Sequence, residues 1–213
     1  MAASFPIMDS HSGKQMHSAK TVHLDSHASD TLQYIRASMD AASSLTVPGS
    51  AAIAVGTTGV LAAAISSAPV LRGHWLVIWI AAALVAMAWG GTLLLRQFAP
   101  DGVAPIFSRG PVRKFLLCWA PALFAGAAMT VVHLSHGHVD AIAGTWLLIY
   151  GCSLMSASAI TNKHMGVLGV AFFVLGAITL RLPSQVHMWM LGVGFGGLHL
   201  GFGFYVRQVT HGS

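Results

Sequence analysis

Six long apolar segments follow one another along the chain, and they constrain the fold more than any other feature of the sequence. They lie at residues 50–70, 75–95, 115–135, 141–161, 165–180 and 187–206. A helix needs roughly 20 apolar residues to cross the ~30 Å hydrocarbon layer of a membrane. Strands with unpaired edges are excluded from lipid, and the alternating pattern of a barrel is missing. We therefore predict an all-α fold: a polytopic transmembrane bundle of about six helices.

The composition agrees with a chain surrounded by lipid. Only 8% of the residues are charged and 55% are hydrophobic, whereas a soluble domain carries about 25% charged residues. The sequence pI is about 9.7, which in a soluble protein would suggest nucleic acid. Here the basic residues lie in loops, where anionic lipid headgroups attract them. We expect this protein to be surrounded by the lipid bilayer and to bind no nucleic acid.

The segments before and after the transmembrane domain are polar. Residues 1–28 hold almost no large apolar side chains and are predicted to be a disordered tail. Over residues 29–48, apolar residues recur at spacings of three and four, which predicts an amphipathic helix on the cytoplasmic face or at the interface, followed by a linker. The six-helix transmembrane domain is assigned to residues 49–207, and residues 208–213 form a short C-terminal tail.

The basic residues predict the orientation of the bundle. With six spans, nine of the eleven Lys and Arg residues lie on the side of the two termini, and only Arg72 and Arg181 lie on the other side. Loops rich in Lys and Arg remain in the cytoplasm. We therefore predict that both termini are cytoplasmic, in a bacterial inner membrane.

The turns on the predicted outer side carry histidine. The stretch "HLSHGHVD" puts three histidines and one aspartate into eight residues. Imidazole and carboxylate suit divalent transition metals such as Zn, Cu or Ni. Two other interpretations remain open, a proton-handling surface and plain interfacial histidines without a ligand. The candidate metal ligands are His133, His136, His138, His74, His187 and Asp140.

His199 is the one histidine predicted to lie deep in a span. It lies roughly 18 Å from the outer end of its helix, at about 1.5 Å per residue. An ionisable group at that depth is costly and should face the bundle interior. It is interpreted either as a neutral ring that is hydrogen-bonded to a neighbouring helix or as a functional group, and a pigment bound by His199 alone is a further alternative. The fourth segment supplies four possible partners, Tyr150, Ser153, Ser156 and Ser158. Of these, Ser153 is predicted to lie at the same depth as His199.

Ser153 and His199 together suggest a nucleophile and its base. The motif "GCSL" at 151–154 loosely resembles the Gly-x-Ser of rhomboid intramembrane proteases. The second span lacks the His or Asn that would form an oxyanion site, and "LGFG" after His199 departs from the family's closely spaced glycine pair. An intramembrane hydrolase is therefore kept as the second alternative only.

Glycines in the last segment predict close helix packing. Gly192 and Gly196, and likewise Gly197 and Gly201, are small residues four apart in "LGVGFGGLHLGFGFY". In membranes such pairs let two helix backbones approach closely.

The stretches "VPGSAAIAVGTTGVLAAA", "GTWLLIYG" and "GFGGLHLGFG" resemble a group of small bacterial polytopic membrane proteins with no assigned activity. The resemblance implies a bacterial inner-membrane location and brings no catalytic residues. We predict a non-enzymatic accessory or regulatory subunit that acts through helix contacts with itself or with a membrane protein partner. The alternative is a metal-binding or transport protein that uses the outer histidines and His199.

Overall fold

The computed structural model describes residues 32–35, 47–98, 111–161 and 163–211. The chain divides into two compact units, residues 1–43 and 44–213. In the first unit, residues 32–35 are helical. The polar tail predicted for 1–28 and the remainder of the amphipathic helix predicted for 29–48 lie almost wholly outside the described residues.

The second unit consists of helices, and no strand occurs in the part of the chain that the structure describes. The predicted all-α class is thereby confirmed. Its long helices and the three pieces of its last helix are α2 (Gly49–Ser67), α3 (Trp75–Phe98), α5 (Pro111–Ser135), α6 (Ala141–Ser158), α7 (Lys163–Thr179), α8 (His187–Leu191), η3 (Gly192–Leu198) and α9 (His199–His211). Two single 3₁₀ turns, η1 (Arg72–His74) and η2 (Ser184–Val186), precede α3 and α8.

Five helices of the described residues are long and apolar enough to cross a membrane. They correspond to α2, α3, α5, α6 and the continuous helix from η2 to α9. The predicted fifth span corresponds to α7, which has 17 residues and lies at the lower limit of the roughly 17–25 residues that a span requires. These helices are consistent with an integral membrane protein, and the count of six spans stays a prediction.

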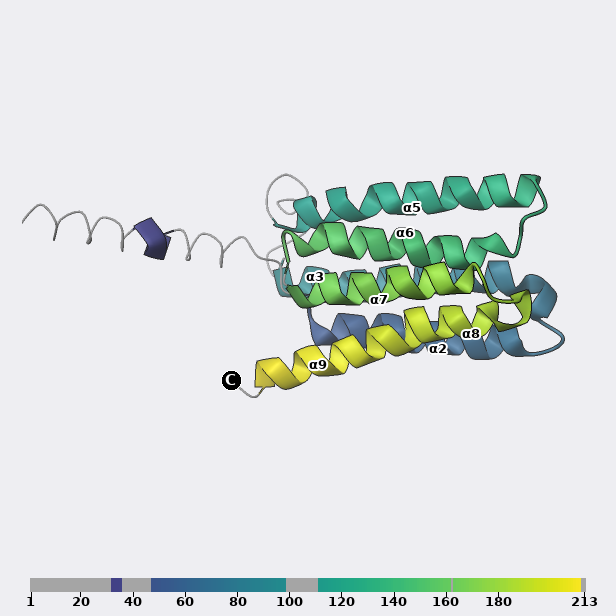
Figure 1. Cartoon of the computed structure of the whole chain (residues 1–213). Helices are drawn as coiled ribbons and strands as arrows, with labels where there is room; N and C mark the ends of the chain where they lie inside the picture. Colours follow the sequence, from purple (N-terminus) through teal and green to yellow (C-terminus); the bar gives the residue numbers. More distant parts are fainter. Residues whose placement is uncertain (1–31, 36–46, 99–110, 162, 212–213) are drawn as a thin grey trace, which may run out of the picture. The chain divides into compact units, whose positions relative to one another are not determined.

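The helices of the second unit run side by side in alternating directions (Figure 1). As a result, the turns at residues 68–74, 136–140 and 180–186 lie at one end of the bundle, opposite the C-terminus. We call this end the three-turn end. It is the end that the distribution of basic residues predicts to face outward.

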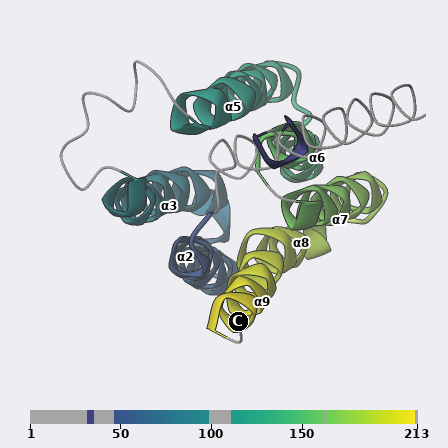
Figure 2. The same ribbon diagram turned by 90° about the vertical axis from the view of Figure 1, so that its left-hand side faces the viewer.

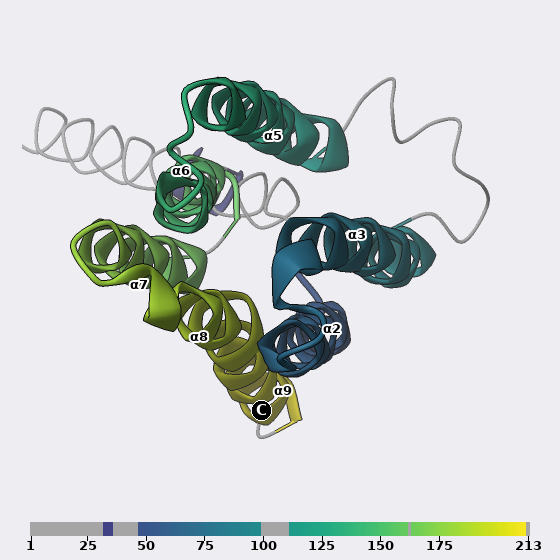
Figure 3. The ribbon, with the colours of Figure 1, turned by 90° about the vertical axis from the view of Figure 1, so that its right-hand side faces the viewer.

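Viewed along their axes, the helices form a curved row (Figures 2 and 3). The order along the row is α5, α6, α7, the α8–α9 helix, α2 and α3, and contacts join each helix to the next. About half of the α2 span (50%) is buried, compared with only 6% of the span in α3 and 11% of that in α5. The two helices at the ends of the row therefore expose most of their apolar surface, as expected of helices that face lipid.

Pairs of glycines bring α6 and α7 together. A Cβ atom added to Gly151 would lie 2.6 Å from the backbone nitrogen of Phe173. One added to Gly176 would lie 2.6 Å from the backbone nitrogen of Leu148. Only glycine fits at these positions, because the opposing backbone occupies the space that a side chain would need. The core next to this seam is formed mainly by Leu147, Leu154, Leu168, Phe172 and Leu191.

Candidate functional site

A Tyr–His pair lies inside the bundle, where α6 meets the last helix. The hydroxyl of Tyr150 and Nε2 of His199 are hydrogen-bonded at 2.9 Å. His199 is only 5% exposed. Aromatic rings surround it, with ring centroids 5.2 Å away for Phe172 and 6.2 Å away for the stacked ring of Phe195. The one histidine predicted to lie deep in a span is thus enclosed by aromatic side chains and held by one hydroxyl.

The local backbone before His199 is a π-helix over Gly192–Leu198. Short π-helical stretches are rare and occur frequently at functional sites. Four of the seven residues in "GVGFGGL" are glycine, so few side chains resist the wider turn. The π-helix ends immediately before His199, and it therefore influences the direction in which the imidazole leaves the helix.

The second ring nitrogen of His199 has no hydrogen-bond partner among the described residues. Nδ1 is buried and unsatisfied. In the tautomer that carries its proton on Nδ1, Nε2 accepts the hydrogen of the Tyr150 hydroxyl. A buried polar atom without a partner is costly and needs an explanation.

Ser153 does not pair with His199. Its hydroxyl donates to the carbonyl of Tyr150 at 2.7 Å, one turn earlier in the same helix, and Nε2 of His199 is hydrogen-bonded to the Tyr150 hydroxyl instead. The two residues predicted as nucleophile and base therefore do not form a hydrogen-bonded dyad. Ser153 is 3% exposed, and its hydroxyl is hydrogen-bonded within its own helix.

The predicted outer histidines make separate contacts at the three-turn end. His133 shares a hydrogen bond of 3.1 Å with the hydroxyl of Thr145. Nδ1 of His136 lies 2.9 Å from the carbonyl of Val132, one turn earlier. His74, His138 and Asp140 are exposed.

No group of three or more His, Cys, Asp or Glu side chains within the described ranges could hold a metal ion. The structure therefore does not bring the six candidate ligands together, and a metal centre built from them stays a prediction. Two of the six, Asp140 and His187, do line a common pocket, together with Arg72.

The four predicted packing glycines divide into two pairs. A Cβ on Gly192 would lie 2.7 Å from Ala63, and one on Gly196 would lie 2.8 Å from Val60, so both face α2. For Gly197 and Gly201, no atom of the described residues lies within 4 Å of such a Cβ. The first pair packs inside the chain, whereas the second pair is open.

The partner of His199 is Tyr150, one of the four polar residues predicted as possible partners, rather than Ser153, although both lie on one turn of α6. The α6–α7 seam was missed by the sequence reasoning. Its signal was a repeat of seven residues, since Gly144 and Gly151 are seven apart, as are Gly169 and Gly176. Seven residues are close to two helical turns, so each pair lies on one helix face.

Comparison of the chain with known protein families, with characterised proteins and with solved structures finds no match. The resemblance to small bacterial membrane proteins therefore stays a prediction.

Proposed function

We propose that this protein is a non-enzymatic accessory or regulatory subunit of a membrane assembly, and that it pairs its last helix with another transmembrane helix. The observation that carries the proposal is the open glycine pair Gly197 and Gly201. Hydrophobicity supplies no driving force between helices in lipid, so close backbone packing at small residues takes its place.

The open pair has the geometry of a helix-pairing surface. Residues four apart lie on one helix face, and both glycines are exposed, with free space where a Cβ would be. Larger exposed side chains lie before and after the pair, namely Val193 and Phe204. The result is a shallow notch between bulky residues, into which the ridge of a second helix can fit.

The neighbouring glycines support this interpretation because they already let the last helix pack closely against another helix of this chain. Gly196 packs against α2, and on α2 a Cβ at Gly56 would lie 2.8 Å from the backbone nitrogen of Leu200. The last helix thus already packs through glycines inside the chain and presents the open pair on another face. We assign the open pair to a partner helix or to a second copy of this chain.

We further propose that the three-turn end faces outward from a bacterial inner membrane. Of the Lys and Arg residues in the described part of the chain, only Arg72 and Arg181 lie at this end. The positive-inside rule then places the opposite end, with the C-terminus, in the cytoplasm.

Replacing Gly197 by leucine tests the pairing proposal. The leucine side chain has room within the monomer but would fill the notch, so we expect association in membranes to be lost while the monomer stays folded. Crosslinking and energy transfer between labelled chains in native membranes, with co-purification of any partner, measure the association.

Gly91→Leu is the matched control. Gly91 lies in α3, another helix, and likewise has no atom within 4 Å of its Cβ position. Unchanged association in the Gly197 variant, or a wild-type chain that is always found alone, would reject the proposal.

A binding or transport role centred on His199 is the second candidate. It is favoured by the unsatisfied Nδ1 of His199, which offers a buried site for a ligand atom. Elemental analysis and an absorbance spectrum of the purified protein, compared with those of a His199→Leu variant, test for a bound metal or pigment. A signal that is the same in both proteins, or no signal in either, removes this candidate.

A further inference from the structure

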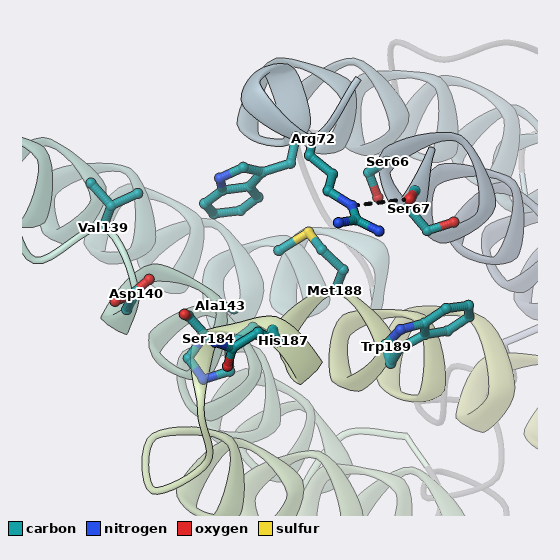
Figure 4. Close-up of a pocket in the computed structure, with 12 residues that line it drawn as sticks. Ser66, Ser67, Arg72, Val139, Asp140, Ala143, Ser184, His187, Met188 and Trp189 are labelled. Carbon is teal, nitrogen blue, oxygen red and sulfur yellow. Dashed lines mark hydrogen bonds between the residues drawn. The ribbon is translucent and has the colours of Figure 1, made fainter. Parts of the chain in front are cut away.

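A pocket with a volume of about 440 Å³ opens at the three-turn end (Figure 4). Its walls come from the end of α2, the start of α3, the start of α6 and the start of the last helix. This volume lies within the range of about 300–1,000 Å³ that is typical of small-ligand sites. The pairing surface at Gly197 and Gly201 does not line this pocket, and neither does the Tyr150–His199 pair.

One wall of the pocket supplies a cation. Nε of Arg72 donates to the carbonyl of Ser67 at 3.3 Å, which fixes the base of the guanidinium group. No carboxylate of the described residues forms an ion pair with Arg72. The remaining N–H donors of the guanidinium make no hydrogen bond with any described residue, so they can bind an anion, and their planar geometry suits phosphate.

Another wall of the pocket supplies an anion, Asp140. Figure 4 shows Asp140 well apart from Arg72. Asp140 precedes α6 and its side chain does not cap the helix. Nε2 of His187 donates to the carbonyl of Leu182 at 2.9 Å, which leaves Nδ1 as an acceptor in the neutral ring. The side-chain oxygens of Ser184 and Gln185 add further acceptors. This wall favours a positively charged group that carries N–H donors.

The surroundings place the pocket at the level of lipid headgroups. Trp75 and Trp189 both line it, and tryptophan is enriched at the boundary between membrane and water. The turns that form the pocket each connect two apolar helices, so they lie where a hydrocarbon layer would end.

We propose that this pocket binds a phosphoethanolamine zwitterion, with its phosphate at Arg72 and its ammonium group at Asp140. Phosphocholine fits less well, because its methylated nitrogen has no N–H to donate to the acceptor wall. Phosphoglycerol lacks the cation altogether. Arg72 and Asp140, which form no ion pair within the described part of the chain, thus favour a headgroup that carries both charges and can donate hydrogen bonds.

The test uses the full chain in vesicles of phosphatidylcholine, with and without phosphatidylethanolamine. Native mass spectrometry of the released protein measures which lipid it retains. We expect enrichment of phosphatidylethanolamine, and about a tenfold loss of this preference in Arg72→Gln and in Asp140→Asn, since each removes one charged hydrogen-bond partner.

Arg181→Gln is the matched control. It removes the same charge at the same end of the bundle, but Arg181 does not line the pocket. Asp140→Glu keeps the carboxylate and should keep the preference. The melting temperature in pure phosphatidylcholine shows whether each variant folds, and if the pocket variants do not fold, the comparison of lipids on the wild-type chain still decides.

Soluble O-phosphoethanolamine separates the two sources of this headgroup. Binding of the soluble compound alone, with no lipid preference, would assign the pocket to a free zwitterion, and retention of the lipid alone would assign it to a membrane headgroup. Equal retention of the two lipids together with no binding of the soluble compound would overturn the proposal, as would an unchanged preference in both folded pocket variants. These results do not depend on helix pairing, because Gly197→Leu leaves the pocket intact.

Discussion

A single hydroxyl group holds the imidazole of His199 inside the bundle. Burying a polar ring is costly unless it is hydrogen-bonded, and Nε2 of His199 has only the Tyr150 hydroxyl, while Nδ1 has no partner among the described residues. The Tyr150 ring also packs edge-on against Phe172, with ring centroids 4.9 Å apart. Tyr150 therefore contributes both a hydrogen bond and packing, and the two contributions can be separated.

Tyr150→Phe removes the hydrogen bond and keeps the ring. Because it leaves Nε2 of His199 buried without a partner, we expect a loss of about 1–3 kcal/mol in the free energy of unfolding. Thermal or chemical unfolding of the detergent-solubilised protein measures this loss.

The control for this substitution is Tyr205→Phe, which breaks the other Tyr–His contact of the described residues. There the hydroxyl lies 3.3 Å from Nδ1 of His164, and the pair is exposed, so little stability should be lost. Equal losses in the free energy of unfolding would show that the buried Tyr150–His199 hydrogen bond stabilises the protein no more than the exposed contact does.

The depth of His199 could be predicted from the sequence, because depth depends only on the rise of a helix and on where the helix begins. Its partner could not be predicted in the same way. Tyr150 and Ser153 lie three residues apart on α6, and which of them meets His199 depends on how α6 is rotated. The π-helix η3 makes the partner of His199 still harder to predict, because it changes the direction of every later side chain in the last helix.

At the scale of elements, glycine placement determines which helices pack tightly. The α6–α7 seam places Gly144 and Gly151 opposite Gly176 and Gly169, so the two backbones touch directly. In membranes, such close contacts replace the hydrophobic effect as the source of helix association. The seam is therefore expected to be sensitive to the addition of a single methyl group.

Gly176→Ala tests this seam. Its Cβ would lie 2.6 Å from the backbone nitrogen of Leu148, so the helices must separate, and overpacking of this kind costs about 1–3 kcal/mol. Gly91→Ala, where the Cβ meets nothing within 4 Å, should be neutral or stabilising by up to about 1 kcal/mol, because alanine favours the helix. Unfolding in detergent compares the two, and equal stability would contradict the seam.

At the scale of the whole molecule, the apolar segments predict the helices and their alternating directions, because short turns force successive helices to run antiparallel. Contacts between helices that are consecutive in the chain, such as α6 and α7, follow from the same argument. The contact between α2 and the last helix does not, since it joins residues far apart in the sequence. It depends on the match of Gly56 and Gly59 with η3 and α9, a match that hydropathy alone does not reveal.

The helix α7 decides whether the bundle has five or six spans, and cysteine labelling measures it directly. Lys163 is the first residue of α7, which has 17 residues, or about 26 Å of helix. Arg181 lies two residues after the end of α7. In a background with Cys118 and Cys152 replaced by alanine, Arg181→Cys should react with a membrane-impermeant maleimide added to intact cells. Lys163→Cys should react only after permeabilisation, because the positive-inside rule places it in the cytoplasm. The reverse pattern would invert the orientation, whereas the same accessibility at both sites would show that α7 does not cross.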